Sequence, residues 1–176
     1  EQDVITESGI ELGENLWLVD TKEIEQHLLA TFPYMETVRV RRTFPPAIEI
    51  HAVPSIAVAA LEQDSSNYVL ITYDGKILEQ GLTLPAWNAL LVKGVSIKNM
   101  EPGDILGQWK NIPALSDEST EETALRKAKN EAGAESAEEQ KEALRMIQFL
   151  YDAMAEASFD NITNLDLTDR YNMKVM

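Results

Sequence analysis

The sequence predicts an α+β protein in which a unit of two helices and two strands is followed by a mixed β domain with a packed C-terminal helix. Three observations lead to this prediction. Apolar and polar residues alternate on both sides of a proline turn at residues 44–46, which is typical of paired strands. Further strand-like runs follow Pro54, and apolar residues recur at helical spacing near the end of the chain. We therefore expect a first domain at residues 1–53 and a second at residues 54–176.

Two short helices are expected at the start of the chain. Residues around Val4 favour a short helix that ends at Gly9. Asp20 is followed three residues later by Glu23, which fits a capping box, so a second helix should begin there. Pro33 should end this helix, because proline cannot continue the helical hydrogen bonds.

A β-hairpin should follow these helices. Val38 and Val40 alternate with arginines before the proline turn, and Ile48 and Ile50 alternate with polar residues after it. Side chains of a strand point alternately to its two faces, so this hairpin should have one buried face and one solvated face.

The second domain should consist of short strands. The pair Asp74-Gly75 lies between two apolar runs and indicates a tight hairpin turn. The polar residues 63–67 and the proline-containing loops indicate further connections. The expected strands cover residues 56–61, 68–73, 77–78, 90–92, 162–167 and 171–176.

An acidic segment separates the last two of these strands from the others. Residues 116–140 are rich in Glu, Ala and Lys, which favours a solvated helical face or an acidic helical insertion, with an interruption at Gly133. Beyond it, Leu144, Ile147 and Leu150 recur at helical spacing, so an amphipathic helix should pack against the domain.

The charge of the chain excludes several classes of partner. Asp and Glu number 30 against 15 Lys and Arg, which gives a formal net charge of −15. Such a surface repels nucleic acid and anionic lipid. The chain has no Cys, which excludes disulfides, thiolate catalysis and iron–sulfur ligation. No stretch has the roughly 18 to 20 apolar residues of a spanning helix.

Residues that could carry out chemistry are few. The two histidines, His27 and His51, are expected at the surface or at an interface, and no catalytic, metal-binding or cofactor-binding residue is expected. The aspartates of segment 160–169 lack the glycine and the distal glutamate of a calcium loop. Because the chain has 30 acids, a carboxylate-dependent hydrolase remains as a less favoured alternative.

One basic cluster stands out against this acidic background. Arg39, Arg41 and Arg42 lie on and after an expected strand. They have two interpretations: a solvated strand face that discourages edge aggregation, or a docking patch for an acidic segment of a partner.

The order of several motifs resembles a known family. Ser8-Gly9-Ile10, the segment GENLWLVD at residues 13–20, a helix that ends at Phe32-Pro33, and the segment VRVRRTFPPAIEI at residues 38–50 resemble the POTRA domain of the bacterial cell-division proteins FtsQ and DivIB. That family usually has an additional strand before the position of Glu1, which we expect to be absent from this sequence. Pro54, the segment YDGKIL at residues 73–78 and the pair Leu84-Pro85 resemble the start of the family's β domain, and residues 162–174 resemble its late strand pair.

The resemblance implies a non-enzymatic, single-pass membrane protein whose extracytoplasmic part is a scaffold at the division septum. Its partners would be FtsB (DivIC) and FtsL, and its membrane anchor would be N-terminal and outside this chain. A partner strand would add to the sheet edge near Tyr171, Met173 and Val175, or to strands just beyond Met176. The alternative is a POTRA-type chaperone or docking module of a secretion or outer-membrane assembly system.

Overall fold

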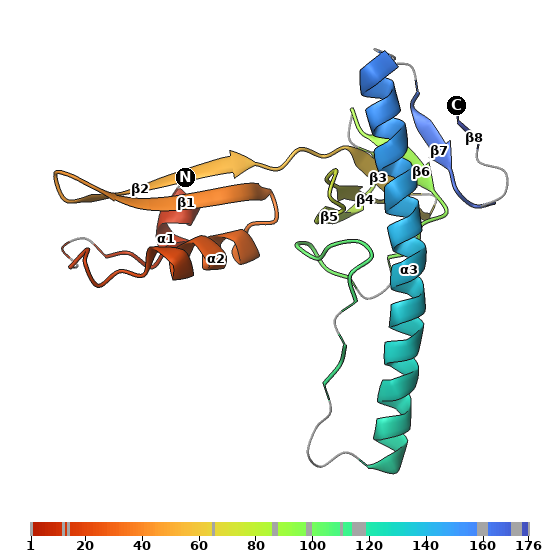
Figure 1. Ribbon diagram of the computed structural model, residues 1–176, viewed down its shortest axis with the longest axis horizontal. Helices are drawn as coiled ribbons and strands as arrows, with labels where there is room; N and C mark the ends of the chain where they lie inside the picture. The colour runs from red at the N-terminus through yellow and green to blue at the C-terminus, as the bar shows by residue number, and fades with distance from the viewer. Residues whose placement is uncertain are drawn as a thin grey trace. The chain divides into compact units, whose positions relative to one another are not determined.

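The computed structural model describes residues 2–11, 13, 15–64, 66–85, 88–97, 100–109, 111–113, 119–157, 162–169 and 174–175. Its helices and strands confirm the predicted α+β class. The chain divides into two compact units, Glu1–Ile56 and Ala57–Met176 (Figure 1).

The first unit contains two helices and a β-hairpin. Asp20 caps the second helix, because its carboxylate accepts hydrogen bonds from the backbone N–H groups of Lys22 at 2.9 Å and Glu23 at 3.2 Å. The predicted start of this helix is therefore confirmed, and the helix ends before Pro33. The elements are α1 (Gln2–Glu7), α2 (Thr21–Thr31), β1 (Met35–Thr43) and β2 (Ala47–Pro54).

The hairpin has the predicted buried and solvated faces. β1 and β2 are antiparallel, and Val40 stands opposite Ile50. Val38 and Val40 are buried and pack with the fully buried Leu28 of α2. In addition, the backbone N–H of Val40 donates to the Glu25 carboxylate over 2.7 Å, so α2 also covers part of the outer edge of β1.

The second unit is built on a six-stranded mixed sheet with strand order β5-β4-β3-β6-β7-β8. β6 runs parallel to both β3 and β7, whereas the other neighbouring strands are antiparallel. The strands are β3 (Ala59–Asp64), β4 (Asn67–Ile71), β5 (Ile77–Leu82), β6 (Leu90–Lys93), β7 (Asn164–Asp166) and β8 (Lys174–Val175).

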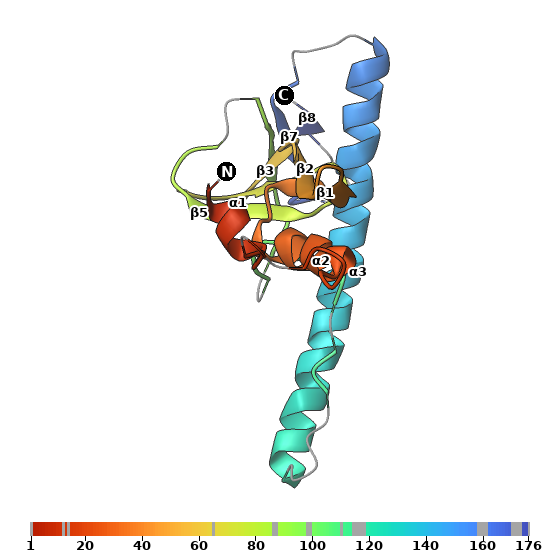
Figure 2. The ribbon, with the colours of Figure 1, turned by 90° about the vertical axis from the view of Figure 1, so that its left-hand side faces the viewer.

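The helix α3 (Thr120–Ala157) lies across one face of this sheet, and its N-terminal part continues beyond the sheet (Figures 1 and 2). Ile147 of α3 is buried against strand residues such as Leu61, Ile71 and Leu165. The opposite face of the sheet holds a smaller apolar cluster formed by Ala60, Leu70 and Leu78.

The expected interruption at Gly133 is wrong, because α3 runs through this residue without a break. The reason for the glycine is a close contact rather than a helix end. A Cβ atom at Gly133 would lie 2.2 Å from Cε2 of Trp109, so only glycine lets the indole ring approach the helix this closely.

Candidate partner-binding edge

One edge of the six-stranded sheet is covered by the chain itself. At the start of β5, the backbone N–H of Ile77 donates to the carbonyl of Asp104, and the N–H of Gly103 donates to the carbonyl of Ile77, both over 2.8 Å. Lys76 also forms a β-bridge with Ile105. Further along β5, Gln80 donates to the carbonyl of Met100 over 2.8 Å. The start of this edge is therefore already paired, and Gln80 is held by a side-chain hydrogen bond.

The opposite edge is formed by β8. Lys174 and Val175 pair with Asp166 and Leu165 of β7, and within the described ranges no further strand pairs with β8. The side chain of Val175 is 48% exposed. Of the three residues expected at this edge, Tyr171 and Met173 lie outside the described residues.

The hydrogen-bond pattern of β7 shows which way the main chain of Val175 faces. Leu167 donates to Lys93 of β6 over 3.0 Å, and Thr163 accepts from Leu91 of β6 over 2.9 Å. Backbone groups alternate in direction along a strand, so Leu165 also faces β6 and Asp166 faces β8. Asp166 and Lys174 are thus the hydrogen-bonded pair of the β7–β8 ladder.

It follows that Leu165 and Val175 form a non-hydrogen-bonded pair. The N–H and C=O of Val175 point away from β7, toward the side on which no described strand pairs with β8. Its side chain lies on the same face as that of the buried Leu165, because opposed residues of an antiparallel pair share a face. The edge therefore presents a main-chain donor and acceptor next to an apolar side chain.

A glycine contact fixes the position of the chain at the end of β7. Gly94 follows β6 with φ of +87°, and a Cβ atom there would lie 2.6 Å from the backbone nitrogen of Thr168. Any larger residue would push the two segments apart, so Gly94 helps to set the register in which β7 meets β6. Periodicity alone does not reveal this role, because the two segments are distant in sequence.

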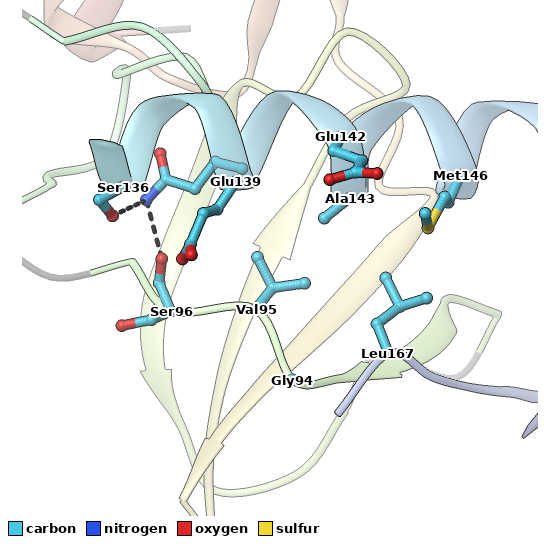
Figure 3. A pocket seen from close by; sticks show the side chains of 10 residues that line it. Gly94, Val95, Ser96, Ser136, Glu139, Glu142, Ala143, Met146 and Leu167 are labelled. Carbon is cyan, nitrogen blue, oxygen red and sulfur yellow. Dashed lines mark hydrogen bonds between the residues drawn. The ribbon is translucent and has the colours of Figure 1, made fainter. Parts of the chain in front are cut away.

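A buried glutamine on α3 joins three segments of the second unit. Gln140 is 5% exposed, and its Oε1 accepts from the backbone N–H of Gly107 over 3.1 Å. Its Nε2 donates to the carbonyl of Ser96 over 2.8 Å and to Oγ of Ser136 over 3.4 Å (Figure 3). The sequence does not predict this role, because Gln140 ends the acidic segment, whose composition favours a solvated helical face or an acidic helical insertion.

The space between α3 and residues 94–96 is too small for a substrate. The cavity measures about 30 Å³ and is lined in part by Glu139 and Glu142 (Figure 3). That volume is on the scale of a single water molecule. Both carboxylates are exposed. This pair of acids therefore does not form the enclosed site that a carboxylate-dependent hydrolase needs.

The arginine cluster belongs to the first unit and divides into two parts. Arg39 and Arg41 are exposed and alternate with the buried valines of β1, so they lie on the solvated face of the hairpin. Arg42 instead donates through Nε to the carbonyl of Leu16 over 2.7 Å and through Nη2 to the carbonyl of Val19. Arg42 therefore holds the loop before α2 against the end of β1.

Both histidines are exposed, and each lies near one carboxylate. Nε2 of His27 is 3.5 Å from Glu7, and Nε2 of His51 is 3.4 Å from Glu49. Among the residues that the structure describes, no group of three or more His, Cys, Asp or Glu side chains could hold a metal ion.

A charged pair lies across two strands beside the β7–β8 edge. Nζ of Lys93 on β6 is 3.0 Å from the Glu62 carboxylate on β3, and this hydrogen bond raises the pKa of Lys93. Asp166 stands opposite Lys93 on the other side and adds to the effect. Lys93 thus remains charged between two carboxylates, which links β3, β6 and β7 on the face away from α3.

Within the described residues, no helix has both the length and the apolar character needed to cross a membrane.

Comparison with known proteins identifies the first unit. The family model of the FtsQ-type POTRA domain matches residues 1–53. The cell division protein DivIB of Clostridium tetani (strain Massachusetts / E88) is 22% identical over 112 residues, which cover 64% of this chain and 42% of the relative. The chain thus spans less than half the length of that relative. With its FtsQ-type POTRA match and its similarity to DivIB, the chain is an FtsQ/DivIB-like protein.

Proposed function

We propose that the protein acts in bacterial cell division as a non-enzymatic, extracytoplasmic scaffold of the divisome that supports assembly of the septum. The FtsQ-type POTRA match and the similarity to DivIB support this role. In this proposal an N-terminal anchor holds the protein in the plasma membrane at the division septum. Its partners are FtsB, or its counterpart DivIC, and FtsL.

The partner binds by adding a strand to the sheet at β8. The single observation that supports this mechanism most strongly is the direction of the Val175 main chain, whose N–H and C=O face away from β7. An extended segment of FtsB or DivIC can satisfy both groups through ladder hydrogen bonds. An apolar side chain of the segment would then lie beside Val175, on the face of the sheet that carries the core.

Because the start of β5 is already paired, a partner strand can add to this sheet more readily at β8 than at β5. Ile77 already exchanges hydrogen bonds with Asp104 and Gly103, so a partner strand would have to displace those residues before it could pair there. Strand addition at β8 displaces no described residue. One protein molecule would therefore recruit one partner strand rather than extend into a chain of sheets.

The exposed arginines supply a second contact in this proposal. Arg39 and Arg41 on the solvated face of the hairpin would attract an acidic segment of a partner. Arg42 contributes less, because its guanidinium group already donates to two carbonyls of its own unit.

A proline substitution at the outward-facing position tests the edge mechanism. We expect Val175→Pro to weaken binding of the purified extracytoplasmic part of FtsB or DivIC by about tenfold or more, because proline removes the outward N–H. The measurement is isothermal titration calorimetry. The β7–β8 ladder should be retained, because the hydrogen-bonded position on β8 is Lys174.

Val175→Thr is the matched control. Threonine is β-branched like valine and retains the N–H, so its affinity should stay within a few-fold of the unmodified protein. Equal affinities of the proline and threonine variants would overturn the edge mechanism. Equally tight binding of unrelated extended peptides would favour the POTRA-type chaperone alternative.

A further inference from the structure

Three large apolar side chains are almost fully exposed at one end of the first unit. Trp17 is 86% exposed, Leu18 is 79% exposed and Phe44 is 94% exposed. Trp17 and Leu18 belong to the loop before α2, and Phe44 belongs to the turn between β1 and β2. We call these three residues the apolar tip. Clustered apolar side chains of this size at a surface usually mark an interaction site.

Hydrogen bonds order the loop before α2 and join it to the end of β1. The Asn15 side chain accepts from the N–H of Trp17 over 3.2 Å, and its carbonyl accepts from the N–H of Leu18 over 2.9 Å. Arg42, at the end of β1, donates to the carbonyl of Leu16 over 2.7 Å. The loop that carries Trp17 and Leu18 is thus preorganised, so it loses little conformational entropy when it binds a partner surface.

The two loops also meet around a shared hollow. It measures about 240 Å³, and its walls come from both loops. The residues that line it are Leu16, Trp17, Arg42, Thr43, Phe44 and Pro46. The aromatic rings of the tip therefore belong to one surface feature rather than to two separate loops.

We propose that the apolar tip inserts into the interfacial layer of a lipid bilayer. Trp and Phe rings with a flanking arginine are the side chains that the boundary between lipid and water favours. The tip consists of side chains that protrude from two turns. A fluid bilayer can accept such a protruding surface without a matching cavity, whereas a folded protein partner would have to supply a complementary pocket.

The chain leaves the first unit at the end of the hairpin opposite the apolar tip. Thr43 and Ala47 are paired beside the tip, whereas Met35 and Pro54 are paired at the other end of the hairpin. The chain therefore leaves the first unit about 25 Å from the tip, as the rise of an eight-residue strand requires.

The charge of the chain predicts which lipids matter. The net charge of −15 opposes binding to anionic headgroups, so affinity should come from insertion of apolar side chains. Exposed Arg41 can bond lipid phosphates, which zwitterionic phosphatidylcholine also presents. Phosphatidylglycerol should therefore not strengthen the binding.

Vesicle sedimentation with the whole chain tests the proposal. We expect it to sediment with vesicles of pure phosphatidylcholine, and no more strongly when part of the lipid is replaced by phosphatidylglycerol. Each of Trp17→Ser and Phe44→Ser should lower the partition coefficient by about tenfold, because each removes one inserted aromatic ring. Both positions are exposed, so the circular dichroism spectrum should not change.

Phe149→Ser is the matched control, because this aromatic side chain on α3 is 76% exposed and lies outside the apolar tip. Its partition coefficient should equal that of the unmodified chain. The proposal is overturned if the protein does not sediment with either vesicle, or if the tip variants sediment as well as the control. Binding only to phosphatidylglycerol vesicles would also overturn it. None of these outcomes bears on the β8 edge.

Discussion

The backbone N–H of Gly107 donates a hydrogen bond over 3.1 Å to Oε1 of Gln140, which is buried on α3. Nε2 of the same side-chain amide donates a hydrogen bond to the carbonyl of Ser96. One side chain thus connects α3 to two loops of the second unit, and the long helix is held to the sheet by polar as well as apolar contacts.

Replacement of this glutamine should destabilise the second unit. Gln140→Leu leaves the N–H of Gly107 and the carbonyl of Ser96 without their partner, and we expect a loss of about 2 to 4 kcal/mol in the free energy of unfolding. Urea denaturation measures this loss. The exposed neighbour provides the control, since Glu139→Gln should change the free energy by less than about 0.5 kcal/mol. Similar losses of unfolding free energy for both variants would show that the hydrogen bonds of Gln140 do not stabilise the second unit.

Substitution of Gly133 should displace the indole ring that packs on it. Alanine at this position favours the helix by about 1 kcal/mol, but its Cβ atom would overlap the ring of Trp109. We expect the ring to move into solvent, with a red shift of the tryptophan emission and a net loss of about 1 to 2 kcal/mol. Ala134→Ser, at an exposed position of the same helix, should leave the emission unchanged. An unshifted spectrum for Gly133→Ala would contradict the close contact.

Two neighbouring arginines should differ in their contribution to stability. Arg42→Lys removes the planar fork that donates to the carbonyls of Leu16 and Val19, so we expect a loss of about 1 kcal/mol. Arg41→Lys, on the solvated face, should change the free energy by less than about 0.5 kcal/mol. Thermal and urea denaturation of both variants measure the two losses in the free energy of unfolding. Equal losses would mean that the Arg42 hydrogen bonds are not formed in solution.

Alkaline pH should weaken the contact between α3 and the turn before β5. Oη of Tyr73 donates to the Asp152 carboxylate over 2.8 Å, and this hydrogen bond raises the pKa of Tyr73 above its ordinary 10.0. Because the folded state holds this proton more tightly, the stabilisation is complete below the ordinary pKa and is lost as the pH rises through the folded value. We expect Tyr73→Phe to remove this part of the pH dependence of the unfolding free energy. Parallel curves for both proteins would contradict the assignment.

Local patterns predicted much of the fold. The alternation around Val38 and Val40 predicted a hairpin with one buried face, and Asp20 predicted the start of α2, because these signals involve residues that are close in sequence. Local reasoning also explains the wrong prediction at Gly133. A glycine is unfavourable inside a helix, so the local pattern indicates a helix break there. Its contact with Trp109 depends on a distant segment, which a local pattern does not record.

The candidate edge could be predicted only in part. The apolar alternation of residues 162–167 predicted the strand that became β7, and Val175 was expected on the strand beside it. The order of strands in the sheet depends on parallel pairing of β6 with β7, and the cover on β5 depends on Asp104 and Gly103. These are tertiary contacts, so sequence periodicity could not show which edge is covered.

Hydrogen exchange at the backbone N–H of Val175 tests the edge mechanism most directly. This N–H faces away from β7, so it should exchange rapidly in the protein alone. When the extracytoplasmic part of FtsB or DivIC is bound, the partner ladder should slow this exchange by at least about tenfold. Equal exchange rates at Val175 in the free and the bound protein would contradict the proposal that the partner adds a strand to β8.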